Sequence, residues 1–236
     1  MRDPLLSLRG LEGGYAPGRP VLSGLSLDLW PGEVVGLRGR NGAGTTTLFR
    51  ALAGLLPHCR AQQVLWRGRP CAFRDPAFQR ARYFVFAENP SFPYFTFSEY
   101  LAYAAACYGQ PVPEVARLVE GFQFQPYTQV LLKDLSLGSR KKAGLIAAFA
   151  LAPSLLLLDE PASGLDFAST EFLYTLLQEY PRRGTVLFSS HILESLCRNA
   201  GRVVVLDQGS LRQTFSGGAV NPKTIREALG YAPPDR

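Results

Sequence analysis

A glycine-rich turn joins an apolar segment to a segment with helical periodicity, an order that few folds accommodate. Residues 34–37 are a strand candidate, residues 39–44 contain three glycines, and residues 45–55 place apolar side chains at helical spacing. Glycines at these positions let successive backbone N–H groups converge on an anion, and the following helix presents its positive end there. The sequence therefore predicts a phosphate-binding strand, loop and helix.

The loop matches the phosphate-binding pattern GxxxxGK[ST] except at its lysine, where Thr45 stands. Thr46 is then the expected Mg²⁺-coordinating hydroxyl. The absent lysine removes a charge-assisted hydrogen bond worth roughly 1.5–3 kcal/mol, or about 10- to 150-fold in affinity. We expect binding to persist while transition-state stabilisation suffers at least as much. The candidate nucleotide-binding residues here are Gly39, Arg40, Asn41, Gly42, Ala43, Gly44, Thr45, Thr46 and Thr47.

Two adjacent carboxylates end the most apolar strand candidate of the chain. Residues 155–158 are leucines, followed by Asp159 and Glu160 at what should be the carboxyl edge of a parallel sheet, where ligands usually bind. Asp159 is suited to hold Mg²⁺ through water, and Glu160 to act as general base on an attacking water. His191 follows another apolar strand candidate, residues 185–188, and could hydrogen-bond a terminal phosphate. A strand-end cap and a structural histidine are the competing interpretations.

The rest of the pattern indicates an α/β chain. Residues 5–11 and 21–29 show the apolar alternation of an antiparallel β start. Residues 64–67 and 82–86 are further strand candidates, and helices are predicted at 98–108, 113–121 and 139–151. From residue 155 strand and helix candidates alternate, which is typical of a parallel sheet.

The order of these motifs resembles that of ATP-binding-cassette (ABC) ATPases from about residue 5 to residue 215. Residues 135–139, Leu-Ser-Leu-Gly-Ser, resemble the family signature LSGGQ and keep Ser136 and Gly138, which by this resemblance meet the partner's γ-phosphate in a nucleotide-sandwich dimer. The first glycine and the glutamine of the signature are changed. The basic run at 140–142 either adds charge near that phosphate or is a solvated helix face.

Three further positions take their roles from the same resemblance. Tyr15 lies where the family's adenine-stacking aromatic residue belongs. Asp166 ends the Ser-Gly-Leu-Asp loop that crosses the dimer interface. Glu88 replaces the usual glutamine that senses Mg²⁺ and couples to the membrane partner, and its carboxylate could still ligate the metal. The aromatic stretch 92–103 would either dock on transmembrane coupling helices or form a subdomain core.

The resemblance implies one nucleotide-binding domain over residues 1–236, with a P-loop NTPase core containing a parallel sheet. It also implies an N-terminal antiparallel β subdomain, a helical subdomain at about 88–152 and a short tail at about 216–236. The implied activity is that of an ATPase with Mg²⁺ and ATP as cofactors, and two nucleotide-binding subunits would drive a separate transmembrane permease. We expect weak ATP binding and slow hydrolysis.

Several alternatives stay open. In a homodimer both sites would lack the lysine, whereas in a heterodimer only one would. The chain could instead be a non-hydrolytic regulatory subunit, or a soluble ATPase acting on nucleic acid or ribosomes, although a single cassette without a coiled-coil insertion argues against nucleic acid. The sequence leaves open the transported substrate, the direction of transport and whether Thr45 is natural.

Composition narrows the location more than the function. With 47% hydrophobic and 19% charged residues, the chain should fold as a globular protein. Its cysteines, at irregular spacings, indicate free thiols in a reducing compartment rather than a zinc site. No apolar run approaches the roughly 18–20 residues that span a bilayer, and no signal segment is evident. We expect a cytoplasmic protein, peripheral on the inner face of the membrane, although the net charge of +6 suits nucleotide, nucleic acid or anionic lipid alike.

Overall fold

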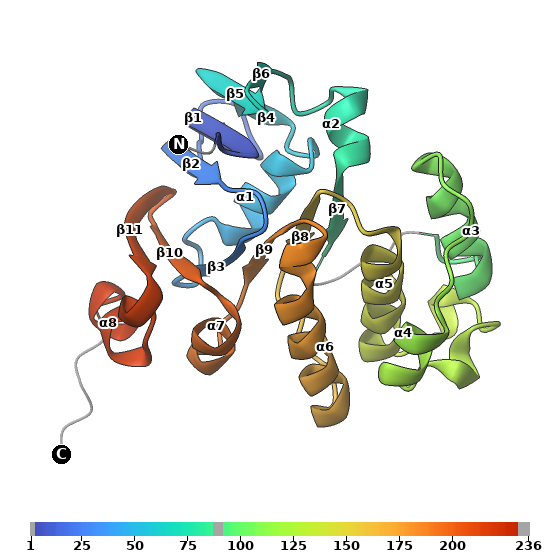
Figure 1. Ribbon diagram of the computed structural model, residues 1–236. Helices are drawn as coiled ribbons and strands as arrows, with labels where there is room; N and C mark the ends of the chain where they lie inside the picture. The colour runs from blue at the N-terminus through green and yellow to red at the C-terminus, as the bar shows by residue number, and fades with distance from the viewer. Residues whose placement is uncertain (1–2, 87–91, 231–236) are drawn as a thin grey trace.

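The computed structural model describes residues 3–86 and 92–230, whose strands form two sheets (Figure 1). Neighbouring strands of the larger sheet are parallel except at one edge, where the last strand runs antiparallel. The predicted parallel sheet is confirmed, and the antiparallel edge strand was not predicted. In spatial order the larger sheet contains β11 (Ser210–Ser216), β10 (Arg202–Asp207), β3 (Val34–Gly39), β9 (Thr185–Ser189), β8 (Leu155–Leu158) and β7 (Arg82–Val85).

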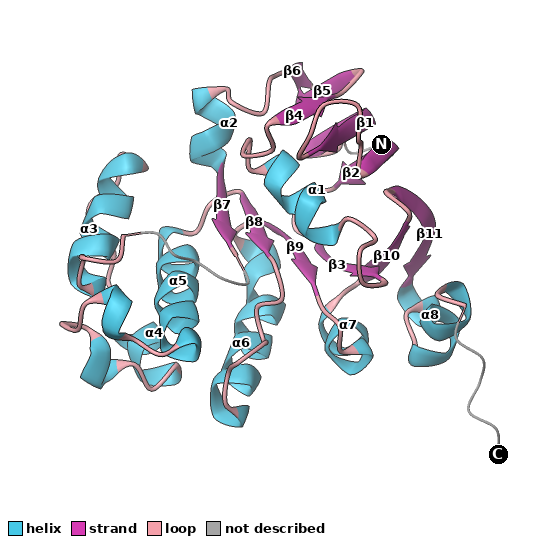
Figure 2. Ribbon diagram, turned by 180° about the vertical axis from the view of Figure 1, so that it is seen from behind, coloured by secondary structure: helices cyan, strands magenta, loops and turns pink. Residues whose placement is uncertain are grey.

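The side chains of β8 alternate between two hydrophobic cores. Leu155 and Leu157 belong to one core, Leu156 and Leu158 to the other, and all four are fully buried. A strand with period-two side chains becomes apolar throughout when both faces of its sheet are covered. From behind, one helix lies between the two sheets and others cover the opposite face (Figure 2). These helices are α1 (Thr45–Leu52) on the first side, and α5 (Leu137–Leu151), α6 (Phe167–Glu179) and α7 (Leu193–Asn199) on the second.

The N-terminal sheet is antiparallel, as predicted. Its strands β1 (Leu6–Gly14) and β2 (Leu22–Leu29) pair along most of their length. All the leucines of both strands enter the core shared with α1. Most of the shorter elements of this region were not predicted, because they contain too few residues to show a period. They are β4 (His58–Arg60), β5 (Gln63–Trp66), β6 (Arg69–Pro70) and α2 (Pro76–Ala81), of which only β5 corresponds to a predicted strand.

Residues 97–151 are mainly helical. The first helix, α3 (Phe97–Cys107), begins with a capping box between Thr96 and Glu99. The second, α4 (Ala116–Gly121), begins three residues later than predicted. The N–H of its first residue, Ala116, donates to the Glu114 carboxylate. The aromatic stretch before and within α3 divides its side chains between interior and surface: Phe97 and Tyr100 are buried, whereas Tyr94 is 73% exposed and Tyr103 is 47% exposed.

The chain beyond β11 is more firmly packed than the sequence indicated. A short helix, α8 (Pro222–Ala228), follows in the predicted tail, and Asn221 caps it by accepting from the Thr224 N–H. Ile225 of this helix is fully buried in the core that also contains Leu196 of α7. Across residues 3–86 and 92–230, no helix has both the length and the apolar character needed to cross a bilayer.

Candidate functional site

Two glycines shape the loop between β3 and α1. Gly42 and Gly44 have φ angles of 80° and 104°, a region that residues with a Cβ atom rarely adopt. α1 begins at Thr45, directly after Gly44, so the unpaired amides of its first turn lie beside the loop. This arrangement of backbone N–H groups and a helix start is one that binds phosphate.

The three threonines that open α1 have different surroundings. The Thr46 hydroxyl donates to Asp159 Oδ2 at 2.9 Å, and the Thr47 hydroxyl donates to the phenol oxygen of Tyr15 at 3.3 Å. Thr45 packs beside Gly39, with its methyl carbon 3.0 Å from the place where a Cβ on that glycine would lie. Position 45 therefore contributes a hydroxyl and a methyl group to the loop, and no charge.

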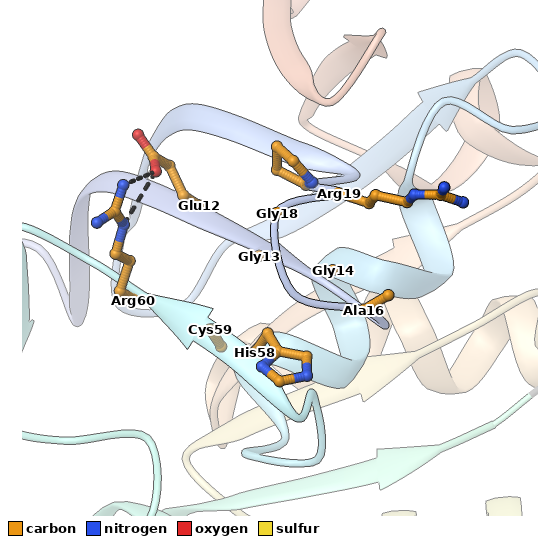
Figure 3. A pocket seen from close by; sticks show the side chains of 10 residues that line it. Glu12, Gly13, Gly14, Ala16, Gly18, Arg19, His58, Cys59 and Arg60 are labelled. Carbon is orange, nitrogen blue, oxygen red and sulfur yellow. Dashed lines mark hydrogen bonds and ion pairs between the residues drawn. The ribbon is translucent and has the colours of Figure 1, made fainter.

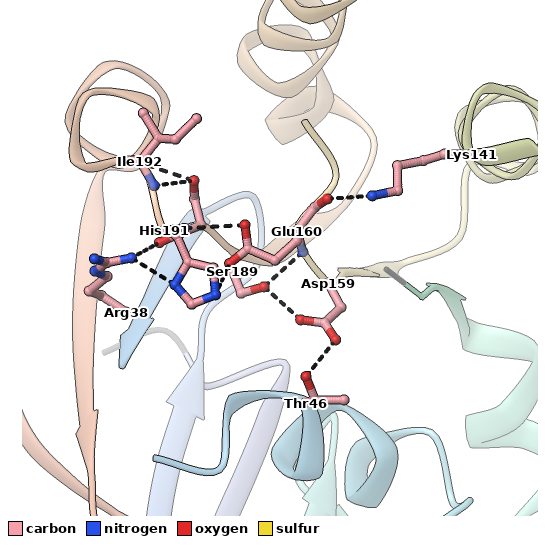
Figure 4. A network of polar contacts seen from close by, with 9 residues as sticks. Arg38, Thr46, Lys141, Asp159, Glu160, Ser189, His191 and Ile192 are labelled. Atoms are coloured by element: carbon pink, nitrogen blue, oxygen red, sulfur yellow. Dashed lines mark hydrogen bonds and ion pairs between the residues drawn. The ribbon is translucent and has the colours of Figure 1, made fainter. Parts of the chain in front are cut away.

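Asp159 lies at the centre of the polar contacts that join the loop to the sheet (Figure 4). Its side chain accepts from the Thr46 hydroxyl through one oxygen and from the Ser189 hydroxyl, at 2.7 Å, through the other. Thr46 and Asp159 follow β3 and β8, and Ser189 is the last residue of β9. The three strands are neighbours in the sheet, so their carboxyl ends meet at one edge. Asp159 is only 2% exposed, and its two oxygens have these partners in place of water.

Glu160 has a left-handed backbone, with φ of 49°. Its N–H donates to the Ser189 hydroxyl at 2.8 Å, and its carbonyl accepts from the Lys141 ammonium at 2.9 Å. The same ammonium donates to the Ser163 carbonyl at 2.8 Å. Burial raises the pKa of the Glu160 carboxyl above its ordinary value, while His191 and Arg38 act in the opposite direction.

His191 lies against the Glu160 carboxylate. Its backbone N–H donates to Glu160 Oε2 at 3.2 Å, and its Nε2 is 3.3 Å from Oε1. Its Nδ1 is 3.1 Å from Nη1 of Arg38, which also donates to the Ser190 carbonyl at 3.0 Å. The structure therefore brings together Thr46, Asp159, Glu160 and His191, four of the residues predicted from three separate motifs.

The signature residues and Asp166 form a second group. Ser136 caps α5 by accepting from the Ser139 N–H at 3.1 Å, and Asp166 caps α6 by accepting from the Ser169 N–H at 2.8 Å. A Cβ on Gly138 would lie 2.5 Å from the Gly164 carbonyl oxygen, so only glycine lets the two loops approach this closely. The hydrogen bonds of Ser136 and Asp166 are made to this region and not to the phosphate loop.

The basic run of α5 is neither a solvated face nor a free source of charge. Lys141 is 5% exposed and Lys142 is 8% exposed. Lys142 donates to Asp166 Oδ2 at 2.6 Å, and Arg140 donates to three carbonyls of the preceding turn. The solvated-face interpretation of this run is wrong, because its side chains tie α5 to the loops that follow β8 and precede α5.

Tyr15 is 48% exposed, and its hydroxyl is turned toward Thr47 of α1. A cavity of about 380 Å³ is lined by the end of β1, the loop that follows it and β4 (Figure 3). His58 and the ion pair between Glu12 and Arg60 line it, and Tyr15 does not. The structure therefore places the Tyr15 hydroxyl beside α1 and leaves Tyr15 out of the lining of this cavity.

Some predicted residues stay outside this geometry, and some site residues were not predicted. Glu88 lies outside the described residues. Arg40 and Asn41 are exposed on the loop, and Arg40 lines a cavity of about 300 Å³ with Asp207. Arg38 and Ser189 were not predicted as site residues. Ser189 could have been suspected, because it ends a buried strand two residues before His191, whereas for Arg38 the sequence shows only a charge before the glycine loop.

A family model for the ABC transporter family matches residues 22–163, more than half of the chain. The chain belongs to the ABC transporter family. The uncharacterized ABC transporter ATP-binding protein YdbJ of Bacillus subtilis (strain 168) is 30% identical over all of this chain and 77% of its own length. The putative ABC transporter ATP-binding protein AlbC of the same organism is 31% identical, over 91% of this chain and 92% of its own length.

Solved ABC structures agree with this assignment. The ATP-binding subunit of an ABC transporter superimposes with a TM-score of 0.82 at 27% identity, covering 96% of this chain and 93% of the other. An ATP-bound bacterial Atm1-family ABC exporter gives a TM-score of 0.81 at 22% identity, covering 99% of this chain and 43% of the other, and shows the shared fold. The chain is an ATP-binding subunit of the ABC transporter type.

Proposed function

We propose that this chain binds Mg²⁺ and ATP between the glycine loop and the acids that follow β8, and that it hydrolyses ATP slowly. The observation that carries the proposal is the 2.9 Å contact between Thr46 and Asp159, which joins two motifs 113 residues apart. The loop from Gly39 to Thr47 would hold the phosphates by its amides. The exposed ring of Tyr15 would stack on the adenine.

The oxygen atoms at this edge of the sheet fit magnesium. A hydroxyl and a carboxylate are hard oxygen ligands of the kind that Mg²⁺ selects, and here Thr46 and Asp159 offer one of each at hydrogen-bond distance. Glu88 is proposed as a third contributor, from its sequence position alone. Bound Mg²⁺ would neutralise charge on the phosphates, and Ser189 would hold the Asp159 carboxylate in orientation.

Glu160 and His191 are the proposed catalytic residues. Glu160 would act as general base toward the attacking water, a role that its burial supports because a raised pKa strengthens a carboxylate as a base. His191 contacts that carboxylate through both its ring and its backbone N–H. Its Nε2 donor would also hydrogen-bond the terminal phosphate when nucleotide is present.

Slow hydrolysis follows from Thr45. The backbone donors of the loop do not depend on the side chain at this position, so binding should persist. The absent ammonium would have opposed the charge that develops on the transferred phosphoryl group, and one such donor is worth roughly 10²–10³ in rate. A non-hydrolytic regulatory subunit is the second candidate function, and the uncharged side chain of Thr45 is the observation that favours it.

Partner subunits complete the proposal. Ser136, Gly138 and Asp166 would contact the nucleotide of a second ATP-binding subunit, as the family resemblance implies. The side chains of Ser136 and Asp166 hydrogen-bond at the starts of their own helices, α5 and α6. A transmembrane permease would dock on the exposed aromatic side chains of Tyr94 and Tyr103. The chain would then act on the cytoplasmic face of the membrane, and nucleic acid is not an expected partner.

Titration with ATP and Mg²⁺, followed by a steady-state phosphate-release assay, tests the proposal. We expect measurable ATP binding and slow release, with both increased in the Thr45→Lys variant. A large rise in hydrolysis would mean that the remaining machinery is intact, whereas an unchanged rate in Thr45→Lys would favour the regulatory subunit. Failure of the wild-type chain to bind ATP at millimolar Mg²⁺ would exclude both.

A further inference from the structure

The residue immediately before the glycine loop brings a cation to the Glu160 end of the site. Arg38 belongs to β3, and the register of β3 with β9 places it beside the segment that follows Ser189. Its guanidinium reaches that segment, where Nη1 donates to the Ser190 carbonyl at 3.0 Å and lies 3.1 Å from His191 Nδ1 (Figure 4). None of the motifs in the sequence includes this arginine.

The contact between Arg38 and His191 determines which ring nitrogen carries the proton. A guanidinium has only donors, so His191 Nδ1 must accept, which requires it to be unprotonated. The hydrogen of the neutral ring then lies on Nε2, the atom 3.3 Å from Glu160 Oε1. The other neutral tautomer and the imidazolium both carry a hydrogen on Nδ1. In either form, the Nδ1–H would face the N–H of the guanidinium, and no hydrogen bond could form between them.

We propose that Arg38 is a positioning residue that acts through His191, by holding the imidazole as the Nε2–H tautomer with a positive charge behind the ring. The carbonyl of Ser190 fixes the guanidinium, and the guanidinium fixes the ring. His191 then offers a donor toward the site, rather than a lone pair. This role rests on the proposed function, because the reaction it serves is ATP hydrolysis. Arg38 also gives the site a positive charge, which the uncharged side chain of Thr45 does not provide.

Histidine NMR on the nucleotide-free protein tests the tautomer directly. The chain has two histidines, so ¹⁵N-histidine labelling gives two rings, which His191→Gln assigns. At alkaline pH we expect His191 to show an unprotonated Nδ1 whose resonance is shifted by an accepted hydrogen bond. Arg38→Met should remove that shift and leave His58 unchanged. A protonated Nδ1 in the wild-type ring, or no response to Arg38→Met, would overturn the proposal.

A double-mutant cycle tests the function of the contact. In single-turnover assays with enzyme in excess, Arg38→Met should slow hydrolysis about 10-fold. This is the lower end of the range expected for the loss of one charge-assisted hydrogen bond. ATP affinity should change much less, and Arg38→Lys should recover part of the rate. In a His191→Gln background Arg38→Met should have almost no further effect, since the two residues act as one unit.

Each outcome separates this proposal from the proposed function. Independent, multiplicative losses in the cycle would contradict action through His191, even if both residues matter. The matched control is Arg117→Met, which breaks an exposed ion pair with Glu179 on the outer helices and should leave the rate unchanged. If the wild-type chain hydrolyses no ATP, the proposed function fails, while the nucleotide-free spectra still decide whether Arg38 sets the tautomer.

Discussion

Glu160 combines features that a purely structural residue rarely has. Its backbone is left-handed, its carboxyl pKa is raised by burial, and the carboxylate of Asp159 precedes it. A non-glycine residue in such a conformation costs of order 1–3 kcal/mol and persists only where its surroundings impose it. Here Lys141 and Ser189 hold the backbone of Glu160 from opposite sides. The strain is therefore located at the carboxylate that we propose as the general base.

Replacement of this acid by its amide should separate binding from chemistry. Glu160→Gln keeps the size of the side chain and removes the base, so hydrolysis should fall by about 10²-fold or more, while ATP affinity changes little. Phosphate release and nucleotide titration measure the two effects. Glu179→Gln, at an exposed glutamate paired with Arg117, is the control. Turnover that survives in Glu160→Gln would assign the base elsewhere.

Ser189 has a larger role than its position at the end of a strand indicates. Its hydroxyl donates to Asp159 and accepts from the Glu160 N–H. Ser189→Ala should lower the free energy of unfolding by about 1–3 kcal/mol, because it leaves buried polar groups without a partner, and it should also weaken Mg²⁺-dependent ATP binding. Urea denaturation and ATP titration test this. Ser210→Ala, at an exposed hydroxyl, should do neither, and equal effects of the two variants would refute the role.

Sequence predicts the residues of this site unevenly, for a physical reason. The glycine loop, Asp159 and Glu160 were predictable because each lies within a short continuous motif. Arg38 and Lys141 were not recognised, because their roles depend on long side chains that reach another element, and the sequence shows the charge but not the partner. Burial of Lys141 could not be seen in a run of three basic residues, which is also the pattern of a solvated helix face.

At the scale of elements, the link between α5 and α6 depends on Lys142 and Asp166. The ammonium of Lys142 is nearly buried and donates to the carboxylate that also caps α6. This hydrogen bond, together with the cap, lowers the pKa of Asp166 below its ordinary value. The pair therefore connects the signature helix α5 to the loop after β8. By the family resemblance, the first region meets the partner's γ-phosphate and the second crosses the dimer interface.

Lys142→Met should destabilise the chain in a pH-dependent manner. Because Asp166 is about half exposed, water screens the interaction and the loss at pH 7 should be only about 1 kcal/mol. A carboxyl with a lowered folded-state pKa stabilises the fold above its unfolded pKa of about 3.9, and this contribution is lost as the pH falls toward the folded value. The difference between variant and wild type should therefore be constant from neutral pH to about pH 5 and shrink below about pH 4.

Urea unfolding at several pH values measures this difference. The control is Arg117→Met, whose exposed pair with Glu179 should contribute well under about 1 kcal/mol. A gap between Lys142→Met and wild type that widens on acidification would contradict the assigned role of Asp166. Thermal unfolding in the same buffers would show whether both proteins remain cooperatively folded at the acid end.

Elements differ in how far their sequences specify them. β8 was predicted at both ends, because four leucines covered on both faces leave no ambiguity and two acids stop the run. α2, β4 and β6 were missed, because six, three and two residues are too few to show a period. β11 was missed for a different reason: its residues are mostly exposed on an edge, so its strand conformation comes from pairing with β10 and not from apolar alternation.

At the scale of the whole molecule, the order of strands in the larger sheet determines which of the predicted site residues lie together in one chain. Strands β3, β9 and β8 are neighbours, so the glycine loop, His191 and both acids meet at one edge. The signature residues belong to α5 and are tied to α6 instead. The order of strands could not be predicted from alternation alone, since any permutation of buried parallel strands would look the same in the sequence. The resemblance of the motifs implied a parallel sheet, and the order of its strands comes from the structure.

The proposed function places half of each nucleotide site on each subunit, so the complete assembly should form only when nucleotide joins two copies or two different subunits. With Mg²⁺ and ATP, we expect Glu160→Gln to remain largely monomeric, because Thr45 weakens each of the two sites that a homodimer would contain. Thr45→Lys combined with Glu160→Gln restores a charge-assisted hydrogen bond at both, so dimerisation should strengthen by at least about 10-fold per site. Multi-angle light scattering after size-exclusion chromatography measures the change. A stable nucleotide-dependent dimer of the Glu160→Gln protein would instead mean that the lysine is dispensable for pairing, and that two identical subunits suffice.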